Sequence, residues 1–273
     1  FDSVQDAINY ANAAYQLNGD EVEVWVAKGT YYTGEERRDS FILRKGVRVY
    51  GGFIGTETDL EDRDYEGNTT ILSGDIGSLN DATDNSYHVV IGSDDAILDG
   101  FTITGGNADK EDGGEVYDNK GGGLLNYAAG NRVRPSEIPV LGFDTVVRNC
   151  RFEDNYAVEG AASYTYHGAN PVFENCEFNN NTAVYGGAVL DRAGANSKYI
   201  ECTFEENIAS FKGGAAFVDY GTMATFEDCT FDNNSSGTAG GAIYVIDRAS
   251  QATPNETDFD LIDDTWPESL LND

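Results

Sequence analysis

The sequence is poor in the residues on which many enzymes and metal sites depend. Its 273 residues include 2 histidines, 4 cysteines, 1 methionine and 2 tryptophans. Neither His88 nor His167 has a serine or cysteine nearby that would form a nucleophile pair, which argues against a hydrolytic triad. No cysteines stand in the CxxC spacing of a zinc site. The sequence therefore gives no support to nucleophilic or zinc-dependent catalysis.

Basic residues are scarce as well. The chain has 17 lysines and arginines against 48 aspartates and glutamates, a formal net charge of -31. Such a surface repels nucleic acid phosphates and anionic membranes, so neither is an expected partner. No apolar run approaches the roughly 18 residues of a membrane-spanning helix. The chain opens at Phe1 without a basic and then apolar leader, so we expect a mature or excised segment.

Internal repetition is what the sequence has in abundance. The phrase FNNNTAVYGGAV from Phe178 recurs in related form from Phe152, Phe204 and Phe231, each time two residues after a cysteine. The steps are 26 residues from Cys150 to Cys176, 26 to Cys202 and 27 to Cys229. A fixed period of this length indicates a solenoid whose repeats bury their apolar faces against one another. We therefore predict a single elongated domain over 1–273.

Period-two alternation predicts which side chains of each repeat face inward. It places each cysteine and the phenylalanine two residues later on the same side of a strand. The inward set is Cys150, Cys176, Cys202, Cys229, Phe152, Phe178, Phe204 and Phe231. Another apolar residue lies three positions before each cysteine (Val147, Phe173, Tyr199, Phe226), and this odd separation requires a bend. The polar residue just before each cysteine (Asn149, Asn175, Glu201, Asp228) is placed at that bend.

Asparagine and glycine mark the next two bends. The asparagines tolerate the left-handed conformation, and their side-chain amides can form a ladder from rung to rung. They are Asn155, Asn181, Asn207 and Asn234. Glycine pairs such as Gly186-Gly187 supply the following corner, with Gly160-Ala161 in the first repeat. Three short strands and three bends in ~26 residues describe a parallel β-helix with rungs about 4.8 Å apart.

The remaining segments frame these rungs. Residues 1–18 form a predicted amphipathic helix that caps the N-terminal end, with Ser3 and Asp6 as a capping pair. Residues 20–246 form the rungs, with insertions at 107–120 and 131–143. Residues 247–273 form an acidic tail with apolar side chains, including Phe259, Leu261, Ile262 and Trp266. This tail either closes the last rung or joins a neighbouring subunit in a filament.

The paired FxxN and GGA phrases, such as FNNN with GGAV and FEEN with GGAA, resemble the repeats of polymorphic outer membrane proteins and related surface β-helix proteins. Segments such as GVRVYGGFIGTET and ILDGFTITGGNA resemble their N-terminal rungs, so the likeness covers about residues 20 to 246. The resemblance implies an all-β, right-handed, single-stranded parallel β-helix on a secreted or surface-displayed protein, often serving adhesion or envelope structure. Its motifs encode bends and ladders rather than a reactive site.

Two groups of residues invite a chemical interpretation. The cysteines are expected to form a buried, unreactive thiol ladder, with disulfides between rungs as the alternative. Calcium is the one cofactor that the composition suggests, although none is required. The candidate ligands in the first insertion are Asp109, Glu111, Asp112, Glu115 and Asp118. A solvated acidic loop is the alternative, because this spacing does not match an EF-hand.

Glycan cleavage is the enzymatic alternative, because many pectate-lyase-like and glycosidase proteins share the β-helix. Carboxylates on adjacent rungs, such as Glu205 and Asp232, would stand near the roughly 5 Å separation of a retaining pair. However, Asn179 and Asn180 interrupt this column and no basic residue recurs beside it. We therefore predict no catalytic residue and expect an extracellular or cell-surface structural or adhesive subunit. Its expected partners are copies of itself, cell-surface components or a glycan.

Overall fold

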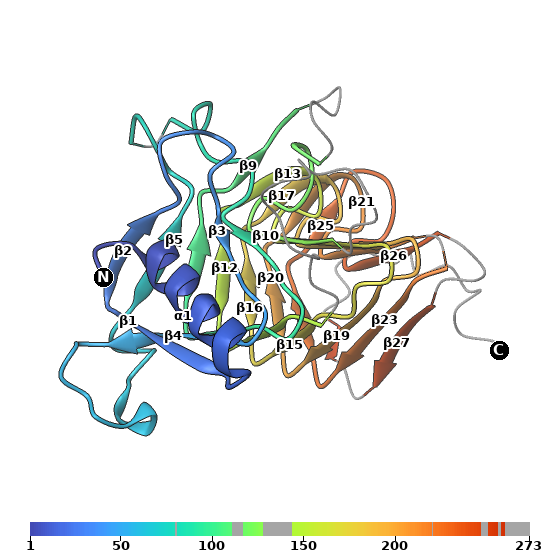
Figure 1. Ribbon diagram of the computed structural model, residues 1–273. Helices are drawn as coiled ribbons and strands as arrows, with labels where there is room; N and C mark the ends of the chain where they lie inside the picture. The colour runs from blue at the N-terminus through green and yellow to red at the C-terminus, as the bar shows by residue number, and fades with distance from the viewer. Residues whose placement is uncertain are drawn as a thin grey trace.

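The computed structural model describes residues 1–79, 81–110, 117–127, 144–219 and 221–246, and the backbone of 251–255 and 258–259 (Figure 1). It begins with helix α1 (Val4–Asn18). The backbone N–H of Asp6 donates to the hydroxyl of Ser3 at 3.2 Å, which confirms the predicted cap. The helix packs against strands β1 (Val22–Ala27), β3 (Phe41–Ile42) and β4 (Val47–Phe53), and so covers part of the N-terminal end of the solenoid. Its buried residues are Val4, Ala7, Ile8 and Ala11.

The described residues after α1 form parallel strands that stack in four sheets. The sheets are numbered in the order in which a rung passes through them. The first sheet contains β1 (Val22–Ala27), β4 (Val47–Phe53), β7 (Ile97–Asp99), β11 (Val146–Arg148), β15 (Val172–Glu174), β19 (Asn196–Ile200), β23 (Met223–Glu227) and β27 (Gln251–Asn255). The second contains β2 (Gly29–Tyr32), β5 (Thr70–Ser73), β8 (Thr102–Thr104), β12 (Arg151–Glu153), β16 (Glu177–Asn179), β20 (Thr203–Glu205), β24 (Thr230–Asp232) and β28 (Asp258–Phe259).

The third and fourth sheets complete each rung. The third contains β9 (Asn107–Ala108), β13 (Tyr156–Glu159), β17 (Thr182–Tyr185), β21 (Ile208–Lys212) and β25 (Ser235–Ser236). The fourth contains β3 (Phe41–Ile42), β6 (Val90–Ile91), β10 (Leu124–Tyr127), β14 (Ser163–Tyr166), β18 (Val189–Arg192), β22 (Ala216–Val218) and β26 (Ile243–Val245). A short 3-10 turn, η1 (Leu60–Asp62), lies in the connection from β4 to β5. This architecture confirms the predicted parallel β-helix with an N-terminal helix.

Two details of the predicted rung are wrong. A full rung has four strands, because residues such as Thr182–Tyr185 alternate and pair with the same segment of the next rung. The left-handed residue at the second bend is the one before each ladder asparagine: Asp154, Asn180, Glu206 and Asn233, with φ of 53° to 55°. The ladder asparagines themselves do not have a positive φ. The first bend is as predicted, with Asn149, Asn175, Glu201 and Asp228 left-handed.

The core is a set of stacked columns that run along the solenoid. Phe152, Phe178, Phe204 and Phe231 are fully buried, with successive ring centroids 5.2, 4.6 and 4.7 Å apart and nearly parallel planes. Phe173, Tyr199 and Phe226 form a second stack that meets the first edge to face. These contacts confirm the predicted inward faces.

The inward asparagines form the predicted ladder. The side-chain nitrogen of Asn155 donates to the amide oxygen of Asn181 at 3.1 Å. Asn181 donates to Asn207 at 3.0 Å and Asn207 to Asn234 at 2.9 Å. The same nitrogens also donate to backbone carbonyls of the preceding rung, such as that of Phe152. Each buried amide is therefore satisfied, which is what an interior polar column requires.

One step of the repeat is a residue longer, and the structure shows where the extra residue lies. Ala183 pairs with Ala209, 26 residues on, whereas Tyr185 pairs with Lys212, 27 residues on. The additional residue therefore forms an irregularity within β21, between Ala209 and Lys212. Such a bulge absorbs an insertion without displacing the interior columns on either side.

Candidate functional site: a groove at the first corner

A polar groove of about 310 Å³ lies outside the corner where the first and second sheets meet. One wall is contributed by the loop after β4, and the floor by the bends of successive rungs. The lining side chains used below are those of Tyr65, Glu66, Asn149, Arg151, Asn175 and Glu177. We call this feature the first-corner groove. It differs from the smooth outer surface that a bare solenoid would present.

The floor of the first-corner groove is an outward-facing chain of hydrogen bonds. The left-handed bends at Asn149 and Asn175 point these side chains away from the core. The side-chain nitrogen of Asn175 donates to the amide oxygen of Asn149 at 2.8 Å. Asn149 in turn donates to the carboxylate of Asp99 at 2.9 Å. Donation therefore runs from Asn175 through Asn149 to the buried carboxylate of Asp99, and the amides are held in place before any ligand arrives.

Arg63 anchors the loop that forms the wall. Its guanidinium donates to the Asp99 carboxylate at 2.7 Å and to the backbone carbonyls of Gly51 and Asp99 at 3.2 Å. It lies over the rings of Tyr50 and Tyr65, 5.1 and 5.3 Å from their centroids. A side chain at Gly52 would overlap the backbone of Tyr65, so the glycine lets the loop approach the sheet. Asp99 thus joins the wall of the groove to its floor.

Arg151 and Glu177 provide charge on adjacent rungs. Arg151 Nε donates to a Glu177 carboxylate oxygen at 2.8 Å, and both side chains are about half exposed, at 49% and 47%. Hydrogen bonding to Glu177 raises the pKa of Arg151. Burial raises the pKa of neighbouring Glu153, with Arg151 opposing the shift and Asp154 and Glu177 adding to it. The pair can therefore offer both donors and acceptors to a polar ligand.

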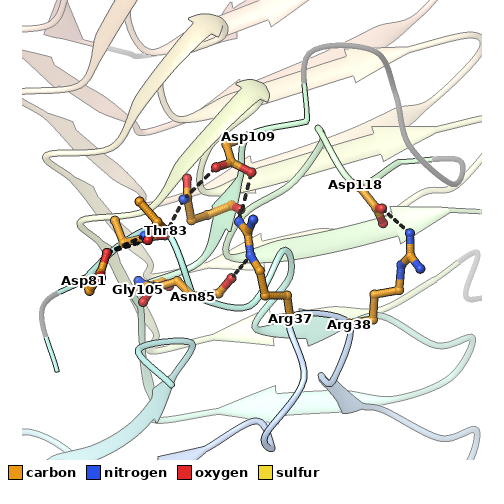
Figure 2. Close-up of polar contacts among 10 residues, drawn as sticks. Arg37, Arg38, Asp81, Thr83, Asn85, Gly105, Asp109 and Asp118 are labelled. Atoms are coloured by element: carbon orange, nitrogen blue, oxygen red, sulfur yellow. Dashed lines mark hydrogen bonds and ion pairs between the residues drawn. The ribbon is translucent and has the colours of Figure 1, made fainter. Parts of the chain in front are cut away.

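The structure pairs the two described calcium candidates with arginines (Figure 2). Arg37 donates to Asp109 at 2.9 Å and also to the backbone carbonyls of Asn85 and Asn107. Arg38 donates to Asp118 at 2.7 Å. Glu111, Asp112 and Glu115 lie outside the described residues. Within the described ranges, no group of three or more His, Cys, Asp or Glu side chains is arranged to hold a metal ion.

The acidic segment from Asn107 to Lys120 begins inside the solenoid. Asn107 and Ala108 form β9, in register with Tyr156 and Ala157. The rung therefore extends two residues into the predicted insertion. Arg37 and Arg38, in the connection between β2 and β3, pair with Asp109 and Asp118 respectively (Figure 2). Asp109 and Asp118 therefore act as structural ion-pair partners of the β2–β3 connection. The insertion at 131–143 lies outside the described residues.

The four cysteines are buried and free. The thiols of Cys176, Cys202 and Cys229 lie 3.3 to 3.5 Å from carbonyl oxygens of the preceding rung. Burial raises the pKa of the Cys150 thiol to about 12. A thiol that stays protonated in a closed core is a poor nucleophile and a poor metal ligand. The expectation of an unreactive thiol ladder fits this geometry.

The histidines occupy separate, ordinary positions. His88 is buried, and its Nδ1 lies 3.0 Å from the carbonyl oxygen of Gly121. Burial lowers the pKa of His88, so the ring is neutral near neutral pH. His167 is exposed at a left-handed bend, as its position at the end of a repeat predicts.

Only one of the four tail residues proposed for assembly falls on described backbone. Phe259 in β28 pairs in register with Phe231 of the same chain. Leu261, Ile262 and Trp266 lie outside the described residues. The register at Phe259 is that of a tail that continues its own solenoid.

Sequence reasoning missed the first-corner groove. Arg63, Tyr65 and Glu66 lie in a loop that belongs to no repeat, and Arg151 follows a cysteine as one outward residue among many. The available signal was the pair Gly51-Gly52 inside a strand, because a glycine there indicates close approach by another backbone.

Comparison with known proteins agrees with this architecture. Residues 90–259, more than half of the chain, match the family model described as right handed beta helix region. Neither the curated proteins nor the solved structures gave a significant match. In the part of the chain that the structure describes, no helix has the length and apolar character needed to span a bilayer.

Proposed function

This chain belongs to the right-handed β-helix family, and from that premise we propose that it is a non-catalytic, glycan-binding adhesive solenoid. The observation that supports the proposal is the first-corner groove, where fixed amides, an arginine–carboxylate pair and a tyrosine line one polar cavity. Sugar hydroxyls both donate and accept hydrogen bonds, and the exposed side chains offer both. Tyr65 offers a ring face on which the apolar side of a sugar can rest.

The charge of the molecule narrows the class of glycan. The net charge is -31, and the groove has Glu66 and Glu177 against one arginine that is already paired. A polyuronate would be repelled on approach and would compete with Glu177 for Arg151. We therefore propose a neutral or amine-bearing polysaccharide as the ligand.

We also propose that the protein acts at the outside of a cell, as a surface or filament subunit that self-associates or contacts cell-surface components. A solenoid of stacked rungs holds a groove rigidly at a distance from either end of the molecule. This arrangement suits display of a binding site, and it requires no moving part.

Affinity electrophoresis through immobilised polysaccharides tests binding. We expect retardation by neutral β-glucan, chitin or its deacetylated form, and none by polygalacturonate. Arg151→Ala should weaken binding about tenfold or more, because it removes a charge-assisted donor and leaves Glu177 without its ionic partner. Glu205→Gln, at an exposed site on β20 outside the groove, is the matched control. Equal binding by both variants, or retardation by none of the polysaccharides, would refute the proposal.

Glycan cleavage is the second candidate, because Glu66 and Glu177 enter the same groove beside Arg151. Two carboxylates flanking a bound sugar are the requirement of a glycosidase. Prolonged incubation with each retained polysaccharide, followed by assay of new reducing ends and unsaturated products, separates the two functions. We expect no turnover. Product that forms with the parent but not with Glu177→Gln would establish the enzyme instead.

A further inference from the structure

An inward-facing polar column runs through the fourth sheet, remote from the first-corner groove. Asn126, Thr165 and Asp191 are in register on three consecutive rungs, β10, β14 and β18. Each is at most 1% exposed. On the following rung the position is taken by Val218, where the interior is apolar again. A carboxyl group is therefore enclosed within the middle of the solenoid.

Among the described residues, the carboxylate of Asp191 is held by hydroxyl groups and by no cation. Ser197 donates to it at 2.7 Å and Tyr199 at 3.2 Å, both from β19. Thr165 of β14 lies beside it, and β22 contributes Val218. Arg192 is directed away, toward Glu159 at 3.0 Å and Asp219 at 2.7 Å. The titratable group that faces Asp191 among the described residues is thus Tyr199. A buried carboxylate without a counter-charge is strongly disfavoured in its ionised form.

The other two members of the column have unused hydrogen-bonding capacity. Within the described part of the chain, neither atom of the Asn126 amide has a hydrogen-bond partner, and the Thr165 hydroxyl makes none of ordinary geometry. Native interiors leave few such groups unpaired. Adjacent rungs place the three side chains about 4.8 Å apart at the backbone, within reach of one another. The column therefore has vacant acceptors next to a carboxyl group that lacks a cation.

We propose that Asp191, Thr165 and Asn126 form a proton-sensitive relay that strengthens the middle rungs when Asp191 is protonated. The proton comes from solvent and adds to one carboxylate oxygen, with no other bond made or broken. The new O–H donates to the Thr165 oxygen, and the Thr165 hydroxyl turns to donate to the amide oxygen of Asn126. Protonation thus removes a buried charge and satisfies two vacant acceptors at once.

The expected pH dependence follows from the direction of the shift. Burial raises the pKa of Asp191 to about 6, and the nearby hydroxyl groups of Ser197, Thr165 and Tyr199 oppose that rise. The unfolded chain has the ordinary value of 3.8. Between these two values the native state binds more protons than the unfolded state, so stability falls as pH rises through this window. The stability that Asp191 contributes is fully present below its pKa in the unfolded chain and is lost above its pKa in the folded protein. The rungs around β14 and β18 therefore loosen above about pH 6.

Comparison of the parent with Asp191→Asn tests the relay. The amide is a neutral mimic of the protonated acid and can donate to Thr165. Denaturant unfolding measures the folding equilibrium constant of both proteins at about pH 4.5 and about pH 7.5. At the higher pH, the constant of Asp191→Asn should exceed that of the parent by up to about a hundredfold. At the lower pH, the difference between the two constants should be smaller. Asp219→Asn, which breaks the pair with Arg192, should instead lower stability at the higher pH.

Two further measurements keep the proposal testable if Asp191→Asn folds poorly. Thr165→Val removes the acceptor, so it should reduce the gain in stability on acidification. Hydrogen exchange of the parent should show β14 and β18 opening more readily at the higher pH. The relay would be overturned if the parent and both column variants had the same dependence of stability on pH. It would also be overturned if isotope-edited infrared spectra showed Asp191 titrating with the pKa of the unfolded chain.

Discussion

At the scale of single residues, four consecutive rungs stack identical phenylalanines in the interior. Phe204 lies between Phe178 and Phe231, with centroids 4.6 and 4.7 Å away, and has no exposed surface. A ring in the middle of such a stack has contacts on both faces and at its edge. Its energetic contribution therefore differs from that of a phenylalanine at the end of the column.

We predict that Phe204→Ala destabilises the protein by about 3 to 5 kcal/mol, because it opens a cavity that neighbouring rungs cannot close. Chemical denaturation of the purified variant measures this change. Phe211→Ala, at a partly exposed ring on the outside of β21, is the control and should cost less than about 1 kcal/mol. Equal midpoints for Phe204→Ala and the parent would show that the stack does not carry the core.

The second glycine of the pairs Gly186-Gly187 and Gly213-Gly214 is required for space rather than for φ. Gly213 is left-handed, whereas Gly214 is not, yet a Cβ on Gly214 would overlap the carbonyl oxygen of Gly241 on the next rung. In the first repeat Ala161 occupies this position at no cost in φ. Gly213 is thus required for its positive φ, and Gly214 for the space that it leaves to the next rung.

We predict that Gly214→Ala lowers stability by about 2 to 3 kcal/mol, because one rung must shift away from the next. Gly194→Ala is the matched control, since Gly194 is left-handed but has open space around it. That variant should lose about 1 kcal/mol from backbone strain alone. Thermal denaturation of the two variants side by side compares them. A larger loss for Gly194→Ala would mean that φ, and not crowding, governs the corner.

At the scale of elements, a buried ion pair anchors the connection from β4 to β5. The side chains of Arg63 and Asp99 are 11% and 5% exposed, and their pair lies between the loop and the first corner. Removing the arginine would leave Asp99 with Arg148 at 3.4 Å and the amide of Asn149. The loop and the groove floor would then lose their common support.

We predict that Arg63→Ala costs about 3 kcal/mol, because it leaves a buried carboxylate poorly compensated. It should also expose residues 54–69 to limited proteolysis and abolish glycan retention. Mass spectrometry of the cleavage sites locates the change. Arg48→Ala, which breaks the more exposed pair with Glu21, should alter stability by less than about 1 kcal/mol and leave the loop protected. Protection of the loop in both variants would show that Arg63 is not its anchor.

The elements that could be predicted from the sequence are those that repeat. Phe, Cys and Asn recur at a fixed interval, so each rung repeats the signal and the interior columns follow. The fourth strand of the rung was missed because Thr182–Tyr185 is short and half exposed. The first-corner groove was missed because Arg63 and Tyr65 meet Asp99 and Asn149 across a separation that no local pattern encodes. Repetition specifies the scaffold, whereas the candidate site lies where repetition fails.

At the scale of the whole molecule, the acidic side chains that the structure describes are not gathered into a metal site. Asp109 and Asp118 already have arginine partners, and the described residues contain no metal-binding cluster. Bound calcium would stabilise the native state in proportion to its affinity.

We predict that excess chelator leaves the melting temperature unchanged, because arginine already compensates the carboxylates nearest the solenoid. Differential scanning calorimetry with and without chelator measures this. A fall in melting temperature that added calcium reverses, and that equal ionic strength of monovalent salt does not, would establish a calcium site.

The C-terminal tail decides how the solenoid ends. The backbone of β28 pairs with β24 in the same chain, which supports self-closure. We therefore predict that deleting residues 253–273 destabilises or aggregates the protein, because it uncovers β24. Light scattering and thermal denaturation of the truncated chain report both effects. Folded, soluble monomers that no longer assemble would instead favour a tail that links subunits.

The four parallel ladders also determine how the molecule bears mechanical load. Strands run across the long axis, so the backbone hydrogen bonds between rungs lie along it. Tension applied to the two chain ends would peel one rung at a time, and each 26-residue step would release on the order of 90 Å of extended chain. Tension transmitted through the sides of the molecule would instead load hydrogen bonds in all four sheets together. The same solenoid is thus compliant when pulled from its ends and stiff when gripped along its length.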